Sequence, residues 1–122
     1  MGTNFYLQKK QPIEYYPTYH IGKRSCGWKP GFEYQPSIKE YLSIKGDYKY
    51  YLEDIKSVND IKQYVDNGHY SIIDEYGKEY SWKDFEKEML KHCPEGKSHT
   101  EIETLTVTKD EDGYEFIHCH YS

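Results

Sequence analysis

The sequence predicts a single α+β domain over residues 1–122, with an antiparallel or mixed sheet and two main helices packed on one face. Aromatic and β-branched stretches near both ends of the chain predict the strands. Between these strands lie two segments that each begin with a serine. In both segments, apolar residues recur at helical spacing. A chain of this length is sufficient for one modest core.

The first half of the chain is predicted from short aromatic stretches and the prolines and glycines that separate them. Proline-containing residues 9–17 indicate a turn, and the glycine-rich residues 22–31 indicate a loop. A serine followed three residues later by a glutamate is typical of a helix start. The elements expected here are strands at 3–7, 18–21 and 31–35, a helical turn at 37–42 and a strand at 48–52.

The two main helices are predicted by their capping residues and their apolar faces. Ser57 and Ser81 are the expected N-caps, and Asp60 and Asp84 lie in the first turns, where the helix dipole favours an anion. An Asn-Gly pair ends the first helix, and Pro94 ends the second. The apolar residues at helical spacing are Val58, Ile61 and Val65 in the first helix, and Trp82, Phe85, Met89 and Leu90 in the second.

Two hairpins complete the expected sheet. Residues 70–73 predict a strand, residues 74–77 a turn and residues 78–80 a short return strand. At the other end, β-branched residues 104–108 and aromatic residues 114–120 flank an acidic turn that ends in a glycine.

Charge is distributed unevenly along the chain, whose formal net charge is −5. Residues 1–36 hold five Lys/Arg against two Glu, whereas residues 37–122 hold eleven Lys/Arg against nineteen Asp/Glu. A soluble protein needs surface charge without any partner, but an acidic face also competes for a basic, nucleic-acid-binding protein. The 15 tyrosines would supply contact area. The predicted partner-binding residues are Asp74, Glu75, Asp84, Glu88, Asp110, Glu111 and Asp112.

A second candidate site is the stretch 19–32, where glycines separate cations, a hydroxyl and an indole. Glycine, lysine and a hydroxyl together can hold a small anion or nucleotide, but the spacing of a Walker motif is missing. The alternative is a glycine-rich hairpin whose cations point into water and whose tryptophan lies in the core. The residues expected to hold a ligand are His20, Lys23, Arg24, Ser25 and Trp28.

No metal, cofactor or enzymatic activity is predicted. The His92-Cys93 and His118-Cys119-His120 groups lack the Cys-x₂₋₄-Cys or His-x₃₋₅-His spacing of zinc sites. The sequence also lacks a nucleophile elbow, a paired-carboxylate motif and a metalloprotease motif.

A cytoplasmic protein is expected from three observations. No apolar run approaches the roughly 20 residues of a membrane span. Residues 1–6 lack the charged and then apolar pattern of a signal peptide. The three cysteines, Cys26, Cys93 and Cys119, are odd in number and widely spaced, as expected of reduced thiols.

Two segments resemble a known family. Residues 1–6 read Met-Gly-Thr-Asn-Phe-Tyr, and residues 20–28 read His-Ile-Gly-Lys-Arg-Ser-Cys-Gly-Trp. They are similar to small uncharacterised phage and prophage proteins that open with Met-Gly-Thr-Asn and two aromatics and then carry His-Ile-Gly-Lys and Gly-Trp. Many of these proteins have a Cys-x-x-Cys before the second segment, where this chain has Glu-Tyr-Tyr-Pro at residues 14–17. The resemblance implies a phage setting but no particular activity.

Charge, tyrosine content and resemblance together predict a phage-encoded counter-defence protein that acts in the host cytoplasm. It is expected to bind and inhibit a bacterial defence component, for example a CRISPR effector nuclease, without binding nucleic acid itself. The alternative is a sponge for a small nucleotide signal, held by the stretch from His20 to Trp28.

Overall fold

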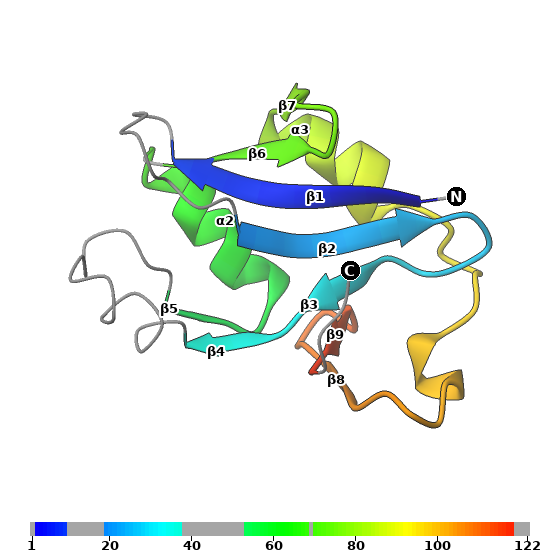
Figure 1. Ribbon diagram of the computed structural model, residues 1–122. Coiled ribbons are helices and arrows are strands. Elements are labelled where there is room, and N and C mark those ends of the chain that lie inside the picture. The colour runs from blue at the N-terminus through cyan, green and yellow to red at the C-terminus, as the bar shows by residue number, and fades with distance from the viewer. Residues whose placement is uncertain (1, 10–18, 38–52, 69, 119–122) are drawn as a thin grey trace.

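The computed structural model describes residues 2–9, 19–37, 53–68 and 70–118, which form an α+β domain around a mixed sheet (Figure 1). This architecture agrees with the predicted α+β class with a mixed sheet and two helices. The strands are β1 (Gly2–Lys9), β2 (Tyr19–Ser25), β3 (Gly31–Glu33), β4 (Gln35–Ser37), β5 (Glu53–Ile55), β6 (Tyr70–Asp74), β7 (Glu79–Tyr80), β8 (Val107–Lys109) and β9 (Glu115–Ile117).

The main sheet has seven strands in the order β7-β6-β1-β2-β3-β9-β8, and β4 pairs with β5 in a separate two-stranded sheet. Neighbouring strands in the main sheet are antiparallel except for β3 and β9, which are parallel and align Phe32 with Phe116. This parallel pair joins the early and the late parts of the chain.

The two predicted helices are confirmed with their caps. Helix α2 (Val58–Asp66) begins where the Ser57 hydroxyl accepts a hydrogen bond from the Asp60 N–H at 3.1 Å. Helix α3 (Trp82–Phe85) begins in the same way at Ser81 and continues into the π-helical turn η2 (Glu86–Leu90). A short 3₁₀ helix, η3 (His99–Glu101), follows later in the chain.

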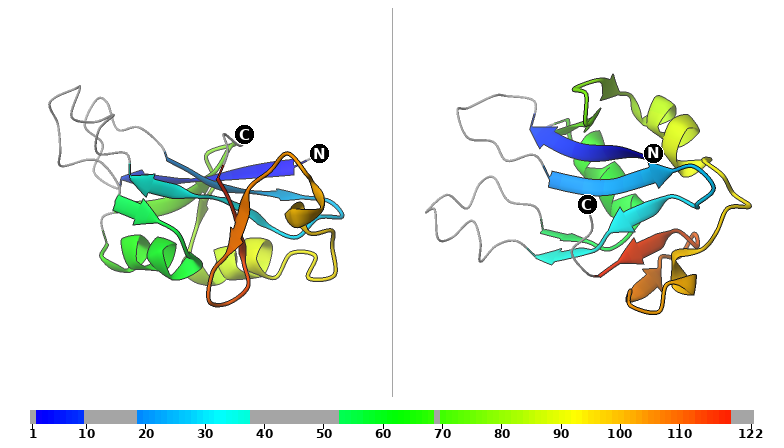
Figure 2. Two further views of the ribbon diagram at one scale, coloured as in Figure 1. Left: turned by 90° about the horizontal axis from the view of Figure 1, so that it is seen from below. Right: turned by 45° about the vertical axis from the view of Figure 1, so that its right-hand side comes forward.

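The core lies between the sheet and the helices. The left view of Figure 2 shows α2 and α3 on the same side of the sheet. Side chains from both layers are buried in one cluster, among them Phe5, Leu7, Ile21, Phe32, Ile61, Ile72, Phe85, Met89 and Phe116. Phe5 contacts Tyr80 and Phe85 edge to face, with ring centroids 5.3 and 5.4 Å apart.

The glycine-rich stretch differs from its prediction. Residues 22–25 were expected to be a loop, but they belong to β2 because they pair with β1 on one side and reach β3 on the other. The glycine at position 22 permits a close approach of strands, since a Cβ there would lie 2.7 Å from the Gly31 carbonyl oxygen. The turn itself falls at residues 26–27, where Gly27 has a φ of +83°.

Most other predicted strands are confirmed, with changed lengths. The β6–β7 and β8–β9 hairpins form as expected, but β8 and β9 have only three residues each. The predicted turn at 9–17 and helical turn at 37–42 lie outside the described residues except for their first residues, which end β1 and β4. The predicted strand at 48–52, Cys119 and His120 also lie outside the described residues.

Candidate functional site

The seven predicted contact residues do not form one surface. Residues 74–75 lie in the β6–β7 hairpin and residues 110–112 in the β8–β9 hairpin. These hairpins occupy opposite edges of the main sheet, because β7 and β8 are its outermost strands. With a strand spacing of about 4.8 Å, roughly 24 Å separates the two hairpins.

Asp74 is a buried turn residue and is unsuited to contact a partner. Its side chain is only 6 % exposed and accepts hydrogen bonds from the Tyr76 and Lys78 N–H groups and the Tyr80 hydroxyl. Burial favours the neutral acid, but these hydrogen bonds and the Lys78 charge together lower the pKa of the Asp74 carboxyl. The Asp74 carboxylate is therefore committed to the turn and offers little surface to a partner.

Three further residues of the predicted set are already engaged. The Asp110 carboxylate accepts hydrogen bonds from the N–H groups of Val58, Asp112 and Tyr114, which ties the β8–β9 turn to the start of α2. Glu88 forms an ion pair with Arg24 at 2.8 Å, and Glu75 accepts a hydrogen bond from the Asn4 N–H. The remaining three, Asp84, Glu111 and Asp112, are exposed.

A different concentration of acidic residues lies in residues 93–115, called the acidic segment from here on. It contains seven Asp/Glu and two Lys, so it carries the whole formal charge of −5 and the remainder of the chain is neutral. The sequence prediction included only the acidic turn at residues 110–112 and missed the acidic residues that precede it. Summing the charges over successive windows of the sequence reveals both. The exposed carboxylates of the segment are Glu95, Glu101, Glu103, Glu111 and Asp112.

The acidic segment is fixed to the sheet by one buried carboxylate. Glu115, which is 2 % exposed, accepts hydrogen bonds from the His99 N–H at 2.8 Å and from the Ser98 hydroxyl. His99 in turn hydrogen-bonds the Lys29 carbonyl oxygen through Nε2 at 2.9 Å. These contacts connect η3, β9 and the turn between β2 and β3.

Trp28 packs on the acidic segment and is absent from the main core cluster. It is half-buried, and its ring stacks on His99 with centroids 5.2 Å apart, while the Lys97 ammonium lies 5.7 Å from its ring centroid. Backbone hydrogen bonds from Lys97 to Gly27 and from Lys29 to Lys97 hold the two segments side by side. The alternative in which Trp28 lies in the core is corrected accordingly.

The predicted anion site does not converge on one cavity. His20 contacts Glu33 through Nδ1 at 3.1 Å and Asn4 through Nε2 at 2.9 Å, and Arg24 pairs with Glu88. Lys23 and Arg24 alternate along β2 and therefore point to opposite faces of the sheet. Ser25 contributes its carbonyl oxygen to His92.

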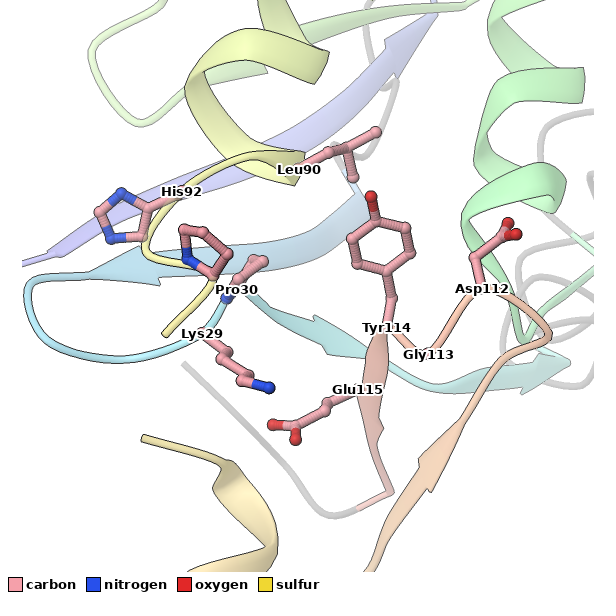
Figure 3. A pocket seen from close by; sticks show the side chains of 9 residues that line it. Lys29, Pro30, Leu90, His92, Asp112, Gly113, Tyr114 and Glu115 are labelled. Carbon is pink, nitrogen blue, oxygen red and sulfur yellow. The ribbon is translucent and has the colours of Figure 1, made fainter. Parts of the chain in front are cut away.

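A pocket of about 220 Å³ lies beside the acidic segment (Figure 3). The Tyr114 hydroxyl at its wall has no hydrogen-bond partner among the residues that the structure describes. Burial raises the pKa of the Tyr114 phenol, and the charges of Asp112, Asp110 and Glu86 raise it further. The side chains around the pocket include Lys29, Pro30, Leu90, His92, Asp112 and Tyr114.

The chain matches no protein-family model, no curated protein and no solved structure. In the described part of the chain, no group of three or more His, Cys, Asp or Glu side chains is placed to hold a metal ion. No helix within the same ranges is long and apolar enough to cross a membrane.

Proposed function

We propose that this chain is a phage counter-defence protein that binds a basic, nucleic-acid-binding protein of the bacterial host, such as a CRISPR effector nuclease. It acts in the host cytoplasm without catalysis, by occupying the groove that the nucleic acid would use. The observation that carries this proposal is the concentration of the formal charge of −5 on the acidic segment.

A concentrated acidic surface suits a basic partner for a physical reason. Lysines and arginines that neutralise phosphates also attract carboxylates, so an acidic protein surface competes directly with nucleic acid. Such fields mainly accelerate association and select the partner, while buried contacts slow dissociation. The exposed Lys97 and Lys109 reduce the charge of the segment without cancelling it.

The proposed contact residues follow from exposure. Glu111 and Asp112 remain from the original set, and Glu95 and Glu103 join them because they are exposed on the same segment. The exposed Glu101 is engaged as well, because it accepts a hydrogen bond from the Ser98 N–H. The phage setting is supported by the resemblance carried by residues 1–6 and 20–28.

The nucleotide sponge has less support. A phosphate would have to displace Glu88 from Arg24 and Glu33 from His20, since both side chains already have carboxylate partners within the chain. Competition between an external anion and an intramolecular carboxylate weakens binding.

The proposal is tested by neutralising carboxylates of the acidic segment. We expect the triple variant Glu95→Gln, Glu103→Gln, Glu111→Gln to slow association with an effector nuclease about tenfold at low salt. The matched control is Glu75→Gln, Glu79→Gln, Asp84→Asn, which removes the same charge from the opposite edge and should change the rate less than about twofold. Association rates are measured by surface plasmon resonance from about 50 to 300 mM salt.

Nuclease inhibition is measured in parallel with association. Two outcomes contradict the proposal: binding that is independent of salt, or an equal loss in both triple variants. Failure of a panel of host nucleases to associate with the wild-type chain contradicts it as well.

A further inference from the structure

The pocket beside the acidic segment has two chemically different ends. Figure 3 shows the Tyr114 hydroxyl pointing towards Leu90 at one end, while Lys29 and Glu115 extend towards the other. Both carboxylate oxygens of Glu115 are occupied by hydrogen bonds from Ser98 and His99. The groups that a ligand could meet are therefore the Lys29 ammonium at this end and the Tyr114 hydroxyl at the other.

The Tyr114 end of the pocket is negatively charged, and its polar groups lack hydrogen-bond partners within the described residues. Within the described residues, the Tyr114 hydroxyl and the Asp112 carboxylate, which line the pocket, have no hydrogen-bond or ion-pair partner, and neither does the Glu86 carboxylate, which is not part of the lining. The charges of both carboxylates reach the phenol, together with that of Asp110, whose oxygens are held by backbone N–H groups. A cationic group placed here would meet free acceptors.

The walls between the two ends are apolar or aromatic. Pro30, Leu90 and Pro94 line the pocket together with the Tyr114 ring. Its volume of about 220 Å³ is below the roughly 300 Å³ at which sites for drug-sized ligands begin. The space suits a single extended side chain.

We propose that this pocket binds the guanidinium group of an arginine side chain, presented by the basic partner of the proposed function, on which this inference rests. A guanidinium is planar and has five N–H donors, so it can donate to several oxygens at once. Its face can stack on the Tyr114 ring, and its aliphatic stem can pack against the prolines and Leu90. A lysine ammonium lacks the planar face and the paired donors.

Because Lys29 lines the pocket, its substitution should have opposite effects on the binding of a cation and of an anion. A cationic ligand is repelled by the Lys29 ammonium, so Lys29→Gln should strengthen binding about threefold. A small anion would need that ammonium, so the same variant would abolish its binding. His92 lies on the Lys29 side of the view and uses its Nε2 to contact the Ser25 carbonyl oxygen.

The probe is N-acetyl-arginine methylamide, with the lysine analogue as the matched ligand. Titration is followed by the NMR signals of the Tyr114 ring. We expect the arginine probe to bind at least about threefold tighter than the lysine probe, and Asp112→Asn to weaken it about tenfold. Tyr114→Phe should also weaken it while leaving the melting temperature unchanged, because its hydroxyl has no partner within the described chain. Glu79→Gln, at the opposite sheet edge, is the control and should have no effect.

Three outcomes overturn the arginine pocket. These are equal affinity for the two probes, shifts that do not involve Tyr114, and binding of inorganic phosphate that is lost in Lys29→Gln. If the probe fails while nuclease association keeps its salt dependence, the pocket is wrong and the proposed function stands. If the probe binds at Tyr114 but no nuclease associates, the pocket stands and the proposed function is wrong.

Discussion

A single carboxylate determines the conformation of the β6–β7 turn. Asp74 receives two backbone N–H groups and one phenol hydroxyl, and these donors stabilise its charged form within a largely buried position. The pKa of Asp74 is therefore lower in the folded chain than in the unfolded chain, even though burial acts in the opposite direction. A charge held in this way makes folding dependent on pH.

The sign of that dependence gives a prediction. The stabilisation from Asp74 is fully present above its unfolded pKa of about 4 and is lost as pH falls towards its lower folded pKa. We expect Asp74→Asn to lower the free energy of unfolding at pH 7 by about 1–3 kcal/mol and to flatten the decline at acid pH. Urea unfolding at pH 7, 5, 4 and about 3 measures both effects. Parallel pH profiles for the variant and the wild type would refute the role of this carboxylate.

At the scale of elements, the β2–β3 turn and the acidic segment are packed backbone against backbone. A Cβ at Gly96 would lie 2.7 Å from the Trp28 carbonyl carbon, 2.8 Å from the Cys93 sulfur and 2.9 Å from the Lys29 nitrogen. Two of these three atoms belong to the backbone and cannot rotate away. Glycine is therefore required at this position by the close approach of two segments.

Gly96→Ala should separate these segments and lower the free energy of unfolding by about 2–3 kcal/mol. The comparison variant is Gly77→Ala, where a Cβ meets nothing within 4 Å but φ is +84°, and about 1 kcal/mol is expected. Urea unfolding ranks the two variants, and Trp28 fluorescence reports whether its stack on His99 is lost. An equal or smaller cost at position 96 would show that the contact is loose.

Local chemistry made the helices and hairpins predictable. The serine caps at 57 and 81 and the glycines at 77 and 113 act within a few residues, so the sequence pattern contains all the information. Residues 22–25 became a strand because of partners far along the chain, which no local pattern reveals. Asp74 and Asp110 each stand three residues before a glycine, which is a turn pattern and indicates a structural role. The prediction of partner binding at these two aspartates did not take that pattern into account.

The molecule as a whole depends on β9, which pairs with β3 and β8 and buries Phe116. The Phe116 ring stacks on Phe32 with centroids 5.1 Å apart. We expect Phe116→Ala to lower the free energy of unfolding by about 3–5 kcal/mol, enough to unfold a domain of this size. Circular dichroism and thermal scanning should show loss of the entire fold, and a separate transition for the β8–β9 hairpin would contradict a single cooperative unit.

The way in which Glu115 holds its neighbours also affects how the protein can evolve. The acidic segment is fixed by that buried carboxylate, by His99 and by backbone hydrogen bonds, whereas its exposed glutamates contribute little to the attachment. Substitutions at such exposed positions usually change stability by less than about 0.5 kcal/mol. Successive generations can therefore vary the surface that meets a host protein, and follow mutations in that host, while the anchoring residues and the fold stay unchanged.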